Sequence, residues 1–210
     1  MQVLSRVLSY AVDPLGAIAG NPCEGIKRLY SANRSEIIWT NSDIDQLTRS
    51  CAPEVAHAVA LALHTGLRLG DLLKLSWSHL GDDAIIISTG KSKHRREAII
   101  PLYDDLRAAL ASIPRRSPII LTNSKRCPWT VNSFGSAFDR AKKAAGLDDR
   151  NLHFHDLRGT ACTRFYVSGL SERVIAEIMG WEEETVARII RRYVDRTAAT
   201  QAVLRQLNRK

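Results

Sequence analysis

Apolar residues recur every three to four positions along most of the chain, a spacing typical of amphipathic α-helices. The first such stretch covers residues 1–12, and a segment rich in proline and glycine follows it. A single amphipathic helix cannot form a core of its own, so we expect it to be the last part of another domain. We place the boundary in the polar stretch Ser31–Glu36, which divides the chain into residues 1–33 and 34–210.

From Thr40 onward the pattern predicts mainly helices. Ser42, with Asp45 three residues later, could cap the first of them. Pro53 suits the first turn of the next helix, and Gly66 suits its end. That second helix is apolar nearly all round, so we expect it to be the buried centre of the domain.

Two short segments rich in isoleucine, Ala84–Ser88 and Glu97–Leu102, flank the basic sequence TGKSKHRR and predict a β-hairpin. The remaining periodic stretches predict helices near Tyr103–Ser112, Val131–Ala145, His155–Ser168, Ser171–Met179, Glu183–Tyr193 and Thr197–Leu207. The expected fold is therefore mainly α with a small antiparallel β-sheet (α+β).

Composition narrows the choice of partner. The chain has 45% hydrophobic and 25% charged residues, which is ordinary for a globular protein, and a formal net charge of +8. Such a charge favours an anionic partner, either nucleic acid or a membrane surface. No apolar run approaches the ~18–20 residues of a membrane span, so we expect no membrane insertion.

The four cysteines show neither a CxxC pair nor the spacing of a zinc site. We interpret them as buried, reduced thiols of a cytoplasmic protein, and we expect no metal ion. They are Cys23, Cys51, Cys127 and Cys162.

Three features of the sequence could carry chemistry. If the segment HFHDLRG is helical, His155 and Arg158 share a face, where an imidazole and a permanent cation can together hold an anion and move a proton. Arg68 lies at the end of the buried helix, and Asp71 could orient it. The hairpin loop offers Lys91 and several further cations. Taken alone, the His155–Arg158 pair is better explained as two surface residues. The other two features are equally well explained as a helix-end salt bridge and a solvated basic turn.

The order of these features is more specific than any one of them. Read together, they resemble the catalytic domain of tyrosine recombinases, the phage integrase family, over roughly Trp39–Asp195. The matching stretches are TGLRLGDLLKL, TGKSKHRREAIIPL, HFHDLRGTACTRFYVSGL, IAEIMGW and RRYVD.

The resemblance implies a role for each candidate residue. Arg68 and Arg158 correspond to the two arginines that clamp the scissile phosphate, and Asp71 stands at the acidic position that supports the first arginine. His155 corresponds to the histidine of the HxxR motif.

Four further positions complete the implied site. Lys91 corresponds to the hairpin lysine that protonates the leaving 5′ oxygen, with Lys93 as the alternative. Trp181 stands where the family has histidine or tryptophan. Tyr193 corresponds to the nucleophile, although it lies further from Trp181 than is usual in the family.

The implied activity is site-specific recombination of double-stranded DNA through a 3′-phosphotyrosyl intermediate, without a cofactor. The resemblance also implies self-association on DNA as a tetramer through the C-terminal helix, and a bacterial or phage origin. Residues 1–33 would be a remnant of the N-terminal DNA-clamping domain, with its linker. One further departure is Gly159, where many members have histidine.

Three alternatives remain. A type IB topoisomerase-like activity uses the same chemistry. A truncated, catalytically weak or inactive DNA-binding remnant would explain the missing front domain. A helix-turn-helix regulator could be built on SERVIAEIMGWEEETVARII, but this reading leaves the other motifs unexplained.

Overall fold

We describe the fold from a computed structural model. The chain divides into two units, Met1–Asn33 and Arg34–Lys210. The predicted helix over Thr197–Leu207, and both Lys91 and Lys93, lie outside the described residues. The structure describes residues 2–26, 37–90 and 97–194, without the side chains of Gln2 and Tyr193.

The first unit contains helix α1 (Gln2–Val12), as the apolar spacing predicted. The Asn21 side chain ties the following segment back onto this helix, because its amide donates to the Ser5 carbonyl and to the Ser9 hydroxyl, each at 2.8 Å. Several large apolar side chains of this unit are exposed: Val3, Leu4, Val7, Tyr10, Leu15, Ile18 and Ile26.

The second unit opens with helix α2 (Asn41–Ser50). Its cap is Thr40, whose hydroxyl accepts from the Asp43 N–H while the Asp43 carboxylate accepts from the Thr40 N–H. The expected cap at Ser42, with Asp45, was therefore wrong by two residues. The cap residue needs an extended backbone, and Thr40 is the residue that has it, with φ −75° and ψ 160°.

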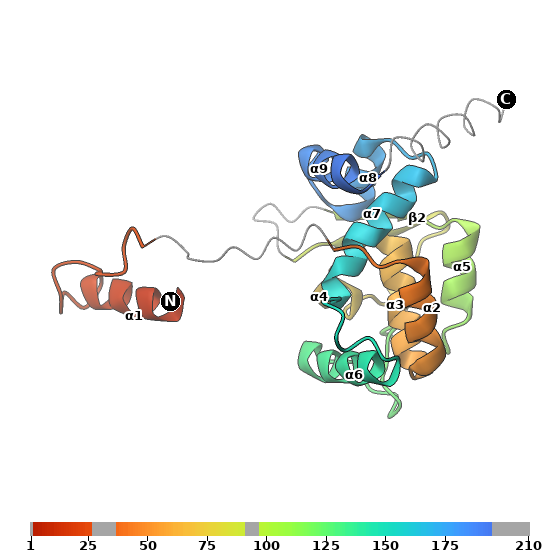
Figure 1. The fold of residues 1–210 in the computed structure, drawn as a ribbon, viewed down its shortest axis with the longest axis horizontal. Coiled ribbons are helices and arrows are strands. Elements are labelled where there is room, and N and C mark those ends of the chain that lie inside the picture. The colour runs from red at the N-terminus through yellow and green to blue at the C-terminus, as the bar shows by residue number, and fades with distance from the viewer. Residues whose placement is uncertain (1, 27–36, 91–96, 195–210) are drawn as a thin grey trace. The chain divides into compact units, whose positions relative to one another are not determined.

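Helix α3 (Pro53–Thr65) is the buried centre of this unit, as predicted, and ends at Gly66 in the left-handed conformation. Helices α2, α5 (Asp104–Ala111), α6 (Val131–Ala144) and α7 (Leu157–Val167) pack around it (Figure 1). The largest fully buried side chains include Trp39, Leu47, Leu61, Leu67, Leu72 and Phe134.

Strands β1 (Ala84–Ser88) and β2 (Glu97–Pro101) form the predicted antiparallel pair, with Ala84 opposite Pro101 and Ser88 opposite Glu97. The inward side chains of the pair are buried, and β2 packs against α8 (Glu172–Met179). The mainly helical fold with a small antiparallel sheet is thus confirmed.

Helices α8 and α9 (Glu183–Tyr193) pack together at one end of this unit, and α6 lies at the opposite end (Figure 1). Three short elements were not predicted: α4 (Leu69–Leu72) and the 3-10 helices η2 (Trp77–His79) and η3 (Phe154–Asp156). None of the helices in the described ranges is long and apolar enough to cross a membrane.

The expectation of four buried thiols was wrong. All four cysteines are unbridged, but only Cys162 is buried, and Cys127 is exposed. Cys127 lies in a turn where its N–H and that of Lys125 both donate to the Asn123 side chain, which places the thiol at the surface.

Candidate active site

Arg158 lies in the first turn of α7 and is only 4% exposed. One guanidinium nitrogen, Nη2, donates to the Met179 carbonyl at 3.3 Å, and Cζ lies 4.7 Å from the centre of the Trp181 ring. Burial, reinforced by the charge of nearby Arg68, lowers the pKa of Arg158 to about 9, while Asp71 opposes this shift. The side chain is thus a desolvated cation fixed by α8 and by an aromatic face.

Arg68 is positioned by the turn that ends α3. Gly66 has φ +62°, and a Cβ atom there would lie 2.6 Å from the Met179 Cε, so the chain turns closely against α8. Arg68 comes two residues later and is the N-cap of α4. Met179 therefore touches the turn before Arg68 with its side chain and holds Arg158 with its carbonyl, which brings the two arginines into one region.

Asp71 is bound to the hairpin. Its Oδ1 atom accepts a hydrogen bond from the Gly90 N–H at 3.1 Å, whereas Oδ2 is buried and has no hydrogen-bond partner among the residues that the structure describes. Arg68 Nη1 likewise lacks a partner within the described part of the chain. The direct support of Arg68 by Asp71 that the resemblance implied is therefore not the contact observed, because the bonded carboxylate oxygen holds Gly90. Lys91 and Lys93, outside the described residues, follow Gly90.

The base of the hairpin also lies against the turn that carries Trp181. Gly180 ends α8 with φ +60°, and a Cβ atom there would lie 3.4 Å from the Thr89 Cγ2. The Trp181 side chain is partly buried and packs against the hydrophobic core. The end of β1, the end of α8 and the start of α7 thus meet at this site.

His155 is exposed, whereas Arg158 is buried. From their spacing we had expected His155 and Arg158 to share one helix, and this expectation was wrong. Asp156 caps η3 by accepting the His153 N–H at 2.7 Å, and α7 begins only at Leu157. The HxxR motif therefore spans a junction between a 3-10 helix and an α-helix.

Tyr193 is the last residue of α9, and its side chain lies outside the described part of the structure. Helix α9 packs against both α7 and α8. The backbone of Tyr193 thus belongs to an element in direct contact with the helix that carries Arg158.

Two contributions to the site were missed because they come from the backbone: the Met179 carbonyl and the Gly90 N–H. No side-chain motif encodes a backbone contact. The close approach at Gly66 was the one available signal, since a left-handed helix end commonly requires glycine.

Cys162, one turn after Arg158, is a buried thiol. Its burial raises its pKa to about 12, so it stays protonated and does not act as a nucleophile near neutral pH. Within residues 2–26, 37–90 and 97–194, no group of three or more His, Cys, Asp or Glu residues lies close enough to hold a metal ion.

The arrangement is suited to binding an oxyanion. Arg68 Nη1 and Arg158 Nε are buried donors without a hydrogen-bond partner among the described residues. Buried donors normally have partners, and guanidinium groups form strong bidentate bonds with phosphate oxygens. A phosphate within reach of both nitrogens would supply the acceptors that they lack.

The chain is similar in sequence to known DNA recombinases and integrases. The chain is 26% identical over 187 residues to the shufflon-specific DNA recombinase of Escherichia coli, covering 86% of the chain and 46% of that protein. It is 28% identical over 141 residues to the integrase of Escherichia phage HK022, covering 62% and 39% respectively. The chain thus spans less than half the length of these two relatives.

The fold is similar to solved structures. A lambda integrase dimer bound to a COC′ core site matches with a TM-score of 0.70 and 21% identity, over 92% of this chain and 72% of that one. XerA recombinase matches with a TM-score of 0.59 and 18% identity, over 83% and 66%. The sequence model of the phage integrase family matches residues 27–199. The chain therefore belongs to the phage integrase family, the tyrosine recombinases.

Proposed function

We propose that this chain is a site-specific DNA recombinase that cuts and rejoins DNA through a 3′-phosphotyrosyl intermediate. The observation that carries the proposal is a pair of arginines with one buried nitrogen each, Arg68 Nη1 and Arg158 Nε, that have no hydrogen-bond partner among the described residues. Such donors match the charge that develops on the non-bridging oxygens of a phosphodiester under attack.

The proposed reaction is a transesterification. The phenolate oxygen of Tyr193 forms a bond with phosphorus, and the bond from phosphorus to the 5′ oxygen breaks. Lys91, or Lys93, gives its proton to that leaving oxygen, and His155 accepts the proton of the phenol. A 5′ hydroxyl of another strand reverses the steps, so the phosphodiester energy is conserved and no cofactor is needed.

We further propose that copies assemble on DNA by docking the expected C-terminal helix Thr197–Leu207 of a neighbour into a groove of about 1070 Å³. Apolar side chains from several helices and β2 line this groove, and Val194, the last described residue, is among them. Among its lining residues, His64 Nδ1 and the Tyr103 hydroxyl lie 2.7 Å apart. Burial raises the pKa of Tyr103 to about 12, so the phenol stays protonated there.

A substitution of a residue that lines the groove tests this proposed docking. Val174 lines it and is 40% exposed, so Val174→Arg should block assembly while leaving binding of one copy to DNA unchanged. Val131, 54% exposed on α6 and absent from the groove lining, provides the matched control Val131→Arg.

The chemical proposal is tested with nicked suicide DNA that carries the recombination site. Unaltered protein should form a covalent adduct, Tyr193→Phe should form none, and the control Tyr166→Phe should form it normally. An adduct that persists in Tyr193→Phe, or maps to another residue, would contradict the assignment. DNA binding without any adduct in the unaltered chain would favour the inactive DNA-binding alternative.

A further inference from the structure

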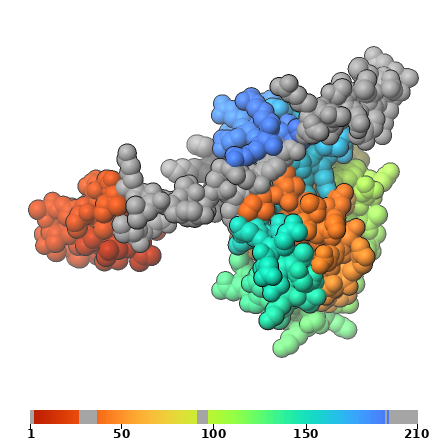
Figure 2. All heavy atoms as spheres, viewed as in Figure 1, coloured from red at the N-terminus to blue at the C-terminus, as the bar shows by residue number. Residues whose placement is uncertain are grey.

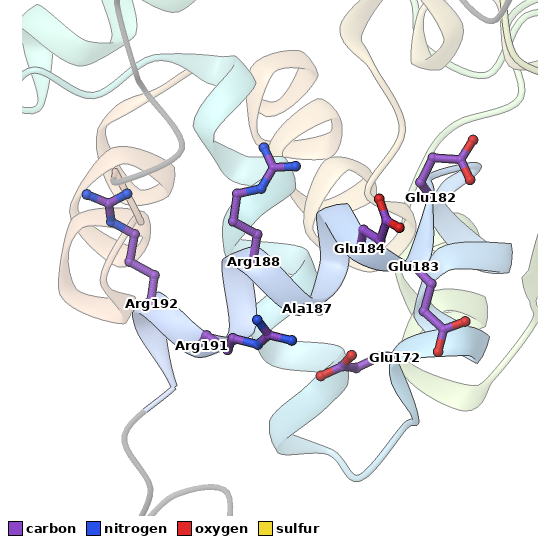
Figure 3. Close-up of a pocket in the computed structure, with 8 residues that line it drawn as sticks. All are labelled: Glu172, Glu182, Glu183, Glu184, Ala187, Arg188, Arg191 and Arg192. Atoms are coloured by element: carbon purple, nitrogen blue, oxygen red, sulfur yellow. The ribbon is translucent and has the colours of Figure 1, made fainter.

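The outer side of helix α9 carries both acidic and basic side chains. Its inner residues Val186, Ile189 and Ile190 are buried in the core, which fixes the helix in place. In the space-filling view, α9 lies at the surface of the second unit (Figure 2). Together with the start of α8 it borders a concavity of about 940 Å³, lined by Glu172, Glu182, Glu183, Glu184, Ala187, Arg188, Arg191 and Arg192 (Figure 3).

The charges are separated along the helix. Glu183 and Glu184 are in the first turn, and Arg191 is in the last turn. Glu184 and Arg188 are four residues apart, a spacing that permits an ion pair on one helix. However, Glu183, Glu184, Arg188 and Arg191 form no ion pair with any residue in the described part of the chain.

The balance of charge in this concavity argues against DNA as its partner. The lining holds three arginines and four glutamates, so its net charge is 3 − 4 = −1, whereas the whole chain carries +8. A surface that binds the phosphate backbone needs an excess of positive charge. A surface with separated acidic and basic ends is instead complementary to another copy of itself.

We infer that the outer face of α9 is a contact between copies of this chain, in which the acidic first turn of one helix meets the basic last turn of the next. The inference rests on the proposed assembly of this recombinase on DNA. It adds a second contact to the proposed docking of the C-terminal helix. Because α9 ends at Tyr193, this contact would link assembly to the segment that carries the proposed nucleophile.

The test uses charge reversal in two variants of the full chain. The variant that we call all-basic carries Glu183→Arg and Glu184→Arg. The variant that we call all-acidic carries Arg188→Glu and Arg191→Glu and keeps Arg192. Both are made in a Tyr193→Phe background, so that covalent chemistry plays no part. Assembly is measured by sedimentation and gel shift on duplex DNA with two recombination sites, and binding of a single copy is measured on one site.

We expect each variant alone to need at least about tenfold more protein for assembly, because like charges would face each other. An equal mixture of the two should assemble within about twofold of the unaltered protein, since opposite charges face each other again. Sodium chloride should weaken the unaltered contact, because exposed charge pairs are screened. The milder variant Glu183→Gln and Glu184→Gln should show a smaller loss, and unfolding in urea checks that every variant folds.

A mixture that assembles no better than its components would overturn the inference, as would normal assembly of both variants alone. A third result would also overturn the inference. If the all-acidic variant binds a single site more weakly and the all-basic variant binds it more strongly, α9 contacts DNA, whatever the mixture does. Matched controls on α6 and its following loop are Arg140→Glu with Lys143→Glu, and Asp148→Arg with Asp149→Arg. Mixing these should restore nothing. Failure of the proposed chemistry would be seen separately, in the adduct assay.

Discussion

The Asp71 carboxylate holds the backbone of Gly90, because its Oδ1 atom accepts the Gly90 N–H at 3.1 Å. A Cβ atom on Gly90 would lie 3.5 Å from the same oxygen, an ordinary van der Waals distance. Gly90 is bonded directly to Lys91. An aspartate that seemed from its spacing to serve Arg68 is therefore placed to fix the base of the loop that carries the proposed general acid.

This contact predicts a specific chemical phenotype for Asp71→Ala. Cleavage of ordinary DNA should fall by about 10²-fold, the usual scale of a lost general acid. A 5′-bridging sulfur leaves with little need for protonation, so a substrate with this sulfur should restore cleavage by Asp71→Ala and Lys91→Ala alike. Asp71→Asn retains an oxygen that can accept from Gly90 and should be milder. Absence of sulfur rescue in Asp71→Ala would mean that Asp71 acts on the arginines instead.

Trp181 should act mainly through the face of its ring. The guanidinium of Arg158 lies 4.7 Å from the ring centre, a cation–π distance. Trp181→Ala should therefore lower cleavage by at least roughly tenfold, whereas Trp181→Phe, which keeps a ring but has no N–H, should retain most of it. Single-turnover rates on suicide DNA measure both. Equal losses in the two variants would show that the indole N–H is the group required.

Arg68→Gln should stabilise the free protein while abolishing cleavage. Burial and Arg68 lower the pKa of Arg158 to about 9, so the folded state holds this proton less tightly than the unfolded chain does. The resulting cost to stability is present in full below pH 9 and diminishes as the pH rises above it. Removing the charge of Arg68 should raise the free energy of unfolding at pH 7 by on the order of 1 kcal/mol.

Urea unfolding checks this gain in stability. Arg173→Gln, on an exposed side chain paired with Glu177, is the control and should change stability by less than about 0.5 kcal/mol. A loss of stability in Arg68→Gln, compared with this control, would contradict the repulsion between the two arginines.

Gly66→Ala should destabilise the second unit by roughly 1–3 kcal/mol. The new Cβ would lie 2.6 Å from the Met179 Cε, in a backbone conformation that side chains rarely adopt. Gly70→Ala is the matched control, because a Cβ there meets nothing within 4 Å and lies inside helix α4. Equal urea midpoints for the two variants would refute the close approach of Gly66 to α8.

The regular elements could largely be predicted from the sequence. The left-handed end of α3 at Gly66 and the isoleucine-rich hairpin follow from local chemistry, since glycine tolerates positive φ and β-branched residues favour strands. The cap of α2 was displaced because Ser42 and Thr40 offer similar hydroxyls, and only the backbone conformation at Thr40 decides between them.

The site was harder to predict than the fold. Spacing identified Arg68 and Arg158 but gave no reason for their proximity, which depends on the Met179 carbonyl and on the approach of Gly66 to α8. The same spacing wrongly joined His155 and Arg158 on one helix, because His155 belongs to the 3-10 turn Phe154–Asp156 and α7 begins only at Leu157. Contacts made by backbone atoms across long stretches of sequence have no local pattern.

Met179 is fully buried, with its side chain against Gly66 and its carbonyl on Arg158. It is one of two methionines in the chain, the other being Met1. Peroxide reaches a buried thioether only when the surrounding structure opens, and the product is a heavier and more polar sulfoxide. The rate of oxidation at Met179, measured by mass spectrometry, therefore reports how often α8 separates from the turn after α3. Oligonucleotides that fill the site should slow that oxidation.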